Sequence, residues 1–164
     1  MWVWLSTSSQ EICKMGYRSD VAIAVAMVSK EDMDELMSVY ALNLFVQKGN
    51  LLSEWDVGEY EGAWVAMYTA EDVKWYDAYD DIKGFEALTK LAESFWEERS
   101  IPYAYRFIRI GEEDNDIEIS CHESDCGGHD DNRGDELSDL LADALYVSRA
   151  VHNDITLTAH NDNN

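Results

Sequence analysis

The segment YRSDVAIAVAMV, residues 17–28, decides the fold, because Val21, Ile23, Val25 and Met27 alternate in it with alanines. Successive side chains of a β-strand lie on opposite faces, so one face carries the large apolar residues and the other carries the alanines. Neither face is polar. This pattern predicts a strand that is covered on both sides.

Three amphipathic helices are predicted. Ser29 directly follows the strand as an N-cap, and Asp32 lies three residues further on, as in a capping box. A second helix is predicted over Gly84–Glu98 and a third from Asp135 to about Val151. In the first helix the apolar positions fall at helical spacing: Met33, Leu36, Met37, Tyr40 and Leu44.

The other apolar runs predict further strands. Gly62–Thr69 and Val73–Tyr76 indicate one bent strand or a tight pair, and Tyr103–Ile110 with Ile117–Cys121 indicates a hairpin across an acidic turn. A short edge strand is predicted at Ile155–Leu157. This order predicts an α+β fold with an antiparallel or mixed sheet and about three amphipathic helices mainly on one face.

Length and composition favour one domain. A chain of 164 residues fits a single core, and we assign residues 15–160 to one acidic α+β domain. Residues 1–14 are expected to be an N-terminal extension that need not be native, since Met15 would serve as a start. No run approaches the ~20 apolar residues of a membrane span. Three cysteines are too few for a disulfide scaffold, so we expect a soluble cytoplasmic protein.

The charge balance is far from that of an ordinary domain. Asp and Glu total 34 against 12 Lys and Arg, a net charge of −22, whereas a magnitude of ~2–8 suffices for solubility. Residues 31–98 hold seventeen carboxylates and four lysines, and residues 112–143 hold thirteen carboxylates and one arginine. Between these blocks, Arg99, Arg106 and Arg109 are expected to pair with neighbouring carboxylates. The acidity excludes direct binding to nucleic acid or anionic membranes and predicts a cationic partner.

A helical repeat is the clearest pattern within the acidic blocks. Asp135, Asp139 and Asp143 recur every four residues, which places carboxylates about 6 Å apart along one side of a helix. One DNA strand repeats its charges at a comparable spacing. Like charges so arranged oppose helix formation, so selection for the electric field itself explains the row. The predicted partner-binding residues are Asp77, Asp80, Asp81, Glu112, Glu113, Asp114, Asp116, Asp135, Asp139 and Asp143.

Three stretches carry a resemblance to a known group of proteins. Tyr17–Ile23, Val73–Asp77 and Phe107–Glu112 resemble motifs of small acidic proteins encoded by bacteriophages and related mobile elements. The resemblance covers roughly residues 15–120. It implies a phage context and assigns no site residue.

The sequence contains no signature of catalysis. A Gly-rich phosphate loop, a Gly-x-Ser-x-Gly elbow, a His-Glu-x-x-His pair and a Rossmann fingerprint are all missing from it. Neighbouring carboxylates such as Asp80 and Asp81 are expected by chance in a chain with 34 acids. We therefore expect neither an enzyme nor a cofactor.

Together these features predict a DNA mimic of bacteriophage type. Such a protein blocks the nucleic-acid-binding channel of a host defence or DNA-processing enzyme, as anti-CRISPR and anti-restriction inhibitors do. The expected partner is a basic nucleic-acid-binding host protein, and a homodimer is left open. Two alternatives are also left open. One is a phage accessory protein that binds a host factor through a specific non-electrostatic patch, and the second is adaptation to molar salt.

A small zinc-binding module is the third alternative. Cys121, His122, Cys126 and His129 lie within nine residues and could supply four ligands. Structural zinc sites usually join two ligand pairs that are far apart in sequence. Cys121 and His122 are adjacent, so they would point to opposite sides of a strand end. The spacing therefore favours a surface loop over a zinc site, and no metal is expected.

Overall fold

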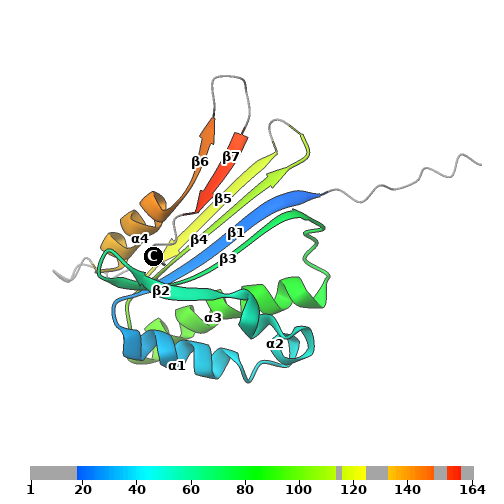
Figure 1. Cartoon of the computed structure of the whole chain (residues 1–164). Coiled ribbons are helices and arrows are strands. Elements are labelled where there is room, and N and C mark those ends of the chain that lie inside the picture. The colour runs from blue at the N-terminus through cyan, green and yellow to red at the C-terminus, as the bar shows by residue number, and fades with distance from the viewer. Residues whose placement is uncertain (1–17, 114–115, 125–132, 150–154, 160–164) are drawn as a thin grey trace, which may run out of the picture.

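A computed structural model of the chain describes residues 18–113, 116–124, 133–149 and 155–159. Within them, five strands form an antiparallel sheet in the order β2-β3-β1-β4-β5, and β6 pairs with β7 (Figure 1). The predicted α+β fold is confirmed. The elements are β1 Ser19–Met27, α1 Lys30–Tyr40, α2 Leu44–Gly49, the 3-10 helix η1 Leu51–Glu54, β2 Asp56–Tyr60, β3 Ala63–Val73, α3 Asp80–Arg99, β4 Tyr103–Gly111, β5 Ile117–Glu123, α4 Arg133–Ala144, β6 Leu145–Arg149 and β7 Ile155–Ala159.

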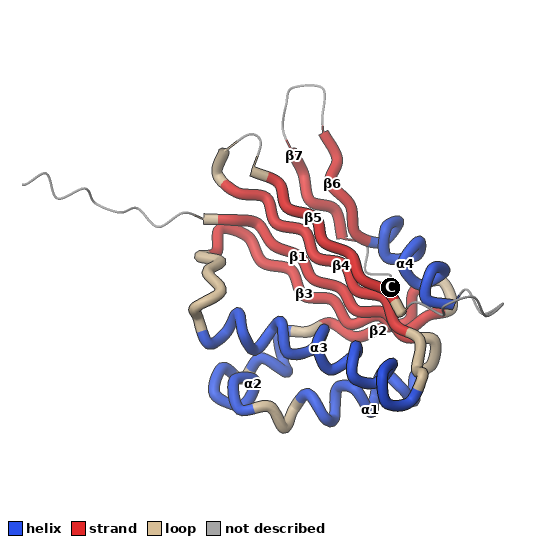
Figure 2. Tube along the Cα trace, turned by 180° about the vertical axis from the view of Figure 1, so that it is seen from behind, coloured by secondary structure: helices blue, strands red, loops and turns tan. Residues whose placement is uncertain are grey.

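The segment that decides the fold is the central strand, as predicted. β1 pairs antiparallel with β3 on one side and β4 on the other, and none of residues 21–27 exposes more than 2% of its surface. Its valine, isoleucine and methionine side chains pack under α1, α2 and α3. Its alanines face α4, where Leu137 and Leu141 complete a second core. Of the described α-helices, α1, α2 and α3 therefore lie on one face of the sheet, and α4 lies on the other (Figure 2).

The first helix begins as predicted and ends earlier. Ser29 is the N-cap, and its hydroxyl accepts a hydrogen bond from the Asp32 amide at 3.1 Å. The helix stops at Tyr40, and Asn43 caps a second helix by accepting from the Phe45 amide. Leu44 therefore starts α2 and is 60% exposed, so its predicted place on the apolar face of the first helix is wrong.

Other boundaries also differ from the sequence prediction, since α3 begins at Asp80 instead of Gly84, and β3 ends at Val73 with no strand over residues 74–76. The last helix ends at Ala144, not near Val151, because residues 145–149 pair with β7. Tyr146 and Val147 favour a strand once a partner is present. The unpredicted strand β2 has a weak local signal, since it holds a glycine and two acids, and it is fixed by the tight turn at Glu61 and Gly62. Both turn residues have positive φ, as two-residue hairpin turns require.

A buried hydrogen-bonded tyrosine links α1 to α3. The Tyr40 hydroxyl donates to the Gly84 carbonyl at 2.9 Å and accepts from the Trp55 indole N–H at 3.0 Å. Tyr40 is 1% exposed, and burial raises the pKa of its phenol to about 12. The phenol therefore stays protonated and keeps both bonds throughout the physiological range.

Replacing Tyr40 with phenylalanine is expected to lower the free energy of unfolding by about 1–3 kcal/mol, because two buried polar groups lose their partner. Urea denaturation measures this, with the exposed Tyr79 changed to phenylalanine as the control. The folded-state pKa of Tyr40 lies above the unfolded value, so its contribution is complete below pH 10 and is lost as the pH rises through about 12. The Tyr40→Phe variant should lose less stability over that interval than the unaltered protein. An equal loss in both proteins would contradict this assignment.

Candidate functional site

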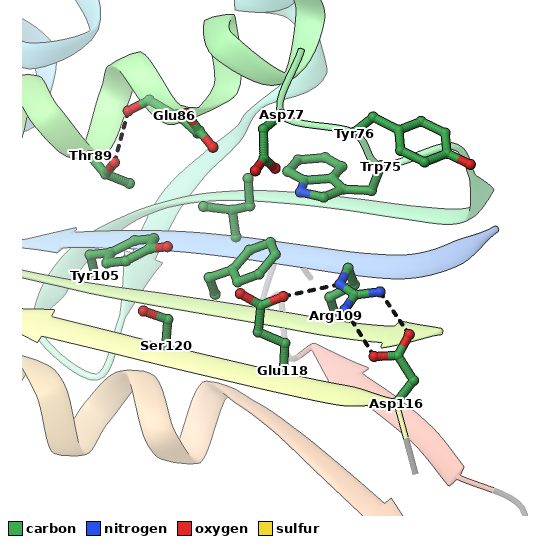
Figure 3. Close-up of a pocket in the computed structure, with 12 residues that line it drawn as sticks. Trp75, Tyr76, Asp77, Glu86, Thr89, Tyr105, Arg109, Asp116, Glu118 and Ser120 are labelled. Atoms are coloured by element: carbon green, nitrogen blue, oxygen red, sulfur yellow. Dashed lines mark hydrogen bonds and ion pairs between the residues drawn. The ribbon is translucent and has the colours of Figure 1, made fainter. Parts of the chain in front are cut away.

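A cleft of about 640 Å³ opens between α3 and strands β4 and β5, on the face of the sheet that the first three helices only partly cover (Figure 3). We call it the acidic cleft. The residues that define it are Trp75, Asp77, Glu86, Tyr105, Asp116 and Glu118.

Strand register places the side chains on the sheet side of the cleft. Tyr105, Phe107 and Arg109 alternate along β4 and share one face. In the neighbouring strand, Ser120 pairs with Phe107, and Glu118 pairs with Arg109. A carboxylate and a hydroxyl of β5 therefore stand beside the aromatic side chains of β4.

The helical side of the cleft is fixed by aromatic packing. The Trp75 ring stacks on Phe85 of α3, with centroids 6.0 Å apart, and lies 5.8 Å from the Phe107 ring of β4. Phe85 and Phe107 are buried. Because Trp75 bridges the helix and the sheet, the segment carrying Asp77 is held at the rim of the cleft.

One arginine neutralises part of the cleft. The Arg109 guanidinium donates two 2.9 Å bonds to the Asp116 carboxylate and one of 3.1 Å to Glu118. These bonds raise the pKa of Arg109, with Asp116 as the largest contributor. Arg99 likewise forms a bidentate pair with Glu35. Arg106 differs from expectation, since it bonds the Leu145 carbonyl and Cys121 Sγ.

The remaining carboxylates give the cleft an excess of negative charge. Asp77 is exposed and makes no hydrogen bond or ion pair within the described residues. Among the residues that the structure describes, the Glu86 carboxylate pairs with Lys90, 3.8 Å away in an exposed pair, and such pairs contribute little. Burial raises the pKa of Tyr105 to about 12, and the charges of Glu86 and Glu118 add to that rise.

The predicted acidic row lies on α4, at the opposite face of the sheet. Asp135, Asp139 and Asp143 are all exposed, while Leu137 and Leu141 on the other side of the helix are buried. Beside the row is a hollow of about 460 Å³, which we call the acidic groove. Its charged lining consists of Glu61, Arg133, Glu136, Asp139 and Asp143.

The other predicted residues lie at the ends of elements. Asp80 and Asp81 open α3, where Asp80 is 3.5 Å from Lys83. Glu112 follows β4 and accepts from the Arg18 amide at 2.8 Å. Glu113 is exposed. Asp114, the last of the ten predicted residues to be placed, lies outside the described residues.

The structure therefore places the predicted residues on two surfaces and at the ends of elements outside both. It brings Asp77 and Asp116 together in the acidic cleft and keeps the α4 row apart on the other face. Sequence reasoning missed Glu86 and Glu118 in the cleft, and Glu61 and Glu136 in the groove. The alternation of Tyr105, Phe107 and Arg109 was a signal for the cleft, because it marks one face of a strand that a hairpin partner must share.

The zinc-module residues separate where the structure describes them. Cys121 lies on the face of Arg106, whereas His122 stacks on Tyr105 at 6.3 Å on the other face. Cys126, His129 and the rest of the predicted loop after Ser124 fall outside the described residues, as do residues 1–14. Within the described part of the chain, no three metal-ligating side chains are grouped.

Comparison with known proteins assigns no family. No protein-family model, curated protein or solved structure matches the chain. The resemblance of the strand motifs to small acidic phage proteins stays a prediction. Among the described helices, none is long and apolar enough to cross a membrane.

Proposed function

We propose that the protein is a non-enzymatic inhibitor that imitates the charged surface of DNA. It would block the nucleic-acid-binding channel of a host defence or DNA-processing enzyme in the bacterial cytoplasm, in the manner of anti-CRISPR and anti-restriction proteins. The observation that carries the proposal is the α4 row. Its three carboxylates are exposed along one side of a helix whose other side is anchored in the core.

The geometry of the row suits a basic partner. Carboxylates one helical turn apart repeat at about 6 Å along the helix axis, which is roughly the axial span of two phosphates of one DNA strand at ~3.4 Å each. The row is held on a rigid helix, so little conformational entropy is lost on binding. Complementary charge accelerates association, and bonds from partner arginines to the carboxylates slow release.

A salt-graded pull-down tests the proposal. Immobilised protein is incubated with bacterial lysate, and bound proteins are eluted with rising salt and identified by mass spectrometry. We expect nucleic-acid-binding enzymes that elute at moderate salt, because pairing between exposed charges weakens as the Debye length falls from about 10 Å at 0.1 M to about 3 Å at 1 M. Duplex DNA added to the lysate should compete. Retention that is unaffected by salt and by DNA would contradict a mimic.

An exposed apolar corner favours a second candidate. Leu42, in the connection from α1 to α2, and Leu44, the first residue of α2, are 74% and 60% exposed. Such side chains suit an accessory protein that binds a host factor through a non-electrostatic patch. Changing both to serine separates the candidates, since a patch binder should lose the partner whereas a DNA mimic should retain it with the same salt dependence.

A further inference from the structure

We propose that the acidic cleft is a receptor for the guanidinium group of an arginine side chain presented by a basic partner protein. The identity of the partner rests on the proposed function. Binding of a guanidinium to the cleft can be tested with a peptide, without a host protein.

The aromatic lining of the cleft suits a planar cation. Trp75, Tyr105 and Phe107 supply aromatic surface around a volume of about 640 Å³, which is within the ~300–1,000 Å³ range of ligand pockets. Aromatic faces attract cations, and arginine is the cation most often found on them. The stacking of Trp75 on Phe85 fixes this lining before any ligand arrives.

The charge of the cleft is incompletely balanced. Among the residues that the structure describes, four carboxylates line it against a single guanidinium, that of Arg109. Arg109 engages Asp116 and Glu118, so on the helical side only the exposed pair of Glu86 with Lys90 offsets the carboxylates of Asp77 and Glu86 within the described residues (Figure 3). With Lys90 also counted, the four carboxylates keep an excess of two negative charges, which one bound guanidinium would lower to one.

The pair of Arg109 with Asp116 shows how a carboxylate of this cleft binds a guanidinium. Arg109 holds the Asp116 carboxylate with two parallel bonds of 2.9 Å, the bidentate geometry that a guanidinium makes and an ammonium cannot. A guanidinium also stacks on aromatic rings, whereas the ammonium of lysine is compact and strongly hydrated. Arginine should therefore bind the cleft more tightly than lysine.

The test is a titration of the full chain, labelled with ¹⁵N, with a blocked Gly-Arg-Gly peptide at low salt. The indole N–H signal of Trp75, identified by its loss in Trp75→Phe, is expected to shift with a millimolar Kd. The double variant Asp77→Asn, Glu86→Gln should weaken binding about tenfold, the loss expected for one charged bond. The matched control Asp139→Asn, Asp143→Asn removes the same charge from the acidic groove and should weaken binding much less than the cleft variant, through the general field alone.

Further arms decide between arginine and other cations. The lysine peptide should bind several-fold more weakly, and the citrulline peptide, which keeps the shape without the charge, should not bind. No shift of the Trp75 signal, equal binding of lysine and arginine, or equal weakening by the control variant would overturn the proposal. The salt-graded pull-down measures partner binding independently of the peptide titration. If the cleft variant loses peptide binding while the captured enzyme is insensitive to salt and DNA, the arginine receptor stands and the DNA mimic fails.

Discussion

Replacing Gly134 with alanine is expected to lower the free energy of unfolding by about 2–3 kcal/mol, the upper range for overpacking a tight site. A Cβ at this position would overlap the carbonyl oxygen of Ser124 and lie 2.8 Å from its hydroxyl oxygen. In an unobstructed helix the same change would stabilise the protein by up to ~1 kcal/mol, because alanine is the better helix former. The sign of the effect therefore reports the contact between α4 and the end of β5.

Ser124 cannot move away easily, because it is bonded to β4. Its amide donates to the Tyr103 carbonyl at 3.0 Å, and its hydroxyl accepts from the Tyr103 amide at 3.2 Å. The added methyl group must then displace the first turn of α4. The acidic row would shift with that turn, so the variant should also bind a basic partner more weakly.

Gly84→Ala provides the matched control. It also adds one methyl group to a buried helical glycine, but the atom it meets most closely is Leu51 Cδ1, at the end of a side chain that can rotate. Urea denaturation of both variants should show the greater loss for Gly134→Ala. If Gly134→Ala were as stable as the unaltered protein, the close approach of α4 to Ser124 would be wrong.

The sequence predicted those elements whose signals are local. The alternation in residues 17–28 predicted β1, the pair Ser29 and Asp32 predicted the start of α1, and the spacing of Tyr103–Ile110 and Ile117–Cys121 predicted a hairpin. The end of α4 was missed because residues 145–149 are strand only through their pairing with β7. Local propensity cannot reveal such a partner.

In the candidate site, too, the part with a local sequence signal could be predicted and the part formed by tertiary packing could not. The row on α4 is an intrahelical repeat, so its spacing could be read directly, and the structure places all three carboxylates on the exposed side. The acidic cleft joins α3, the segment after β3 and two strands. Asp77 and Asp116 line one cleft because the antiparallel order β3-β1-β4-β5 places the end of β3 and the start of β5 at the same end of the sheet. That neighbourhood is set by tertiary packing, and the charge pattern alone could not predict it.

Changing Asp135, Asp139 and Asp143 to asparagine is expected to weaken binding to the captured enzyme by about 100-fold. Close charge pairs across interfaces couple by about 1.5–7 kcal/mol, and a loss of about 2.8 kcal/mol is already 100-fold. The measurement is the Kd of the purified enzyme by calorimetry at 0.1 M salt, with inhibition of its DNA binding as a second readout.

The matched control carries the same change in net charge on the other side of the molecule. Glu93, Glu97 and Glu98 are exposed on α3, and the first two repeat the four-residue spacing of the row. Changing these three to glutamine should weaken binding only several-fold, through the general field. If both triple variants weakened binding equally, total charge and not the row would carry recognition.

The stability of the α4 variant shows whether weaker binding comes from lost contacts with the partner or from unfolding of the protein. Removing the like-charge pairs Asp135–Asp139 and Asp139–Asp143 should recover about 0.2–0.5 kcal/mol each, while Asp135 lies in the first turn of α4, where a negative charge is favourable by about 0.3–1 kcal/mol. The two effects nearly cancel, so the α4 variant should unfold at an almost unchanged urea concentration. A folded protein that no longer binds would then mean that the row is kept for its partner, because folding alone gains nothing from three aspartates in line.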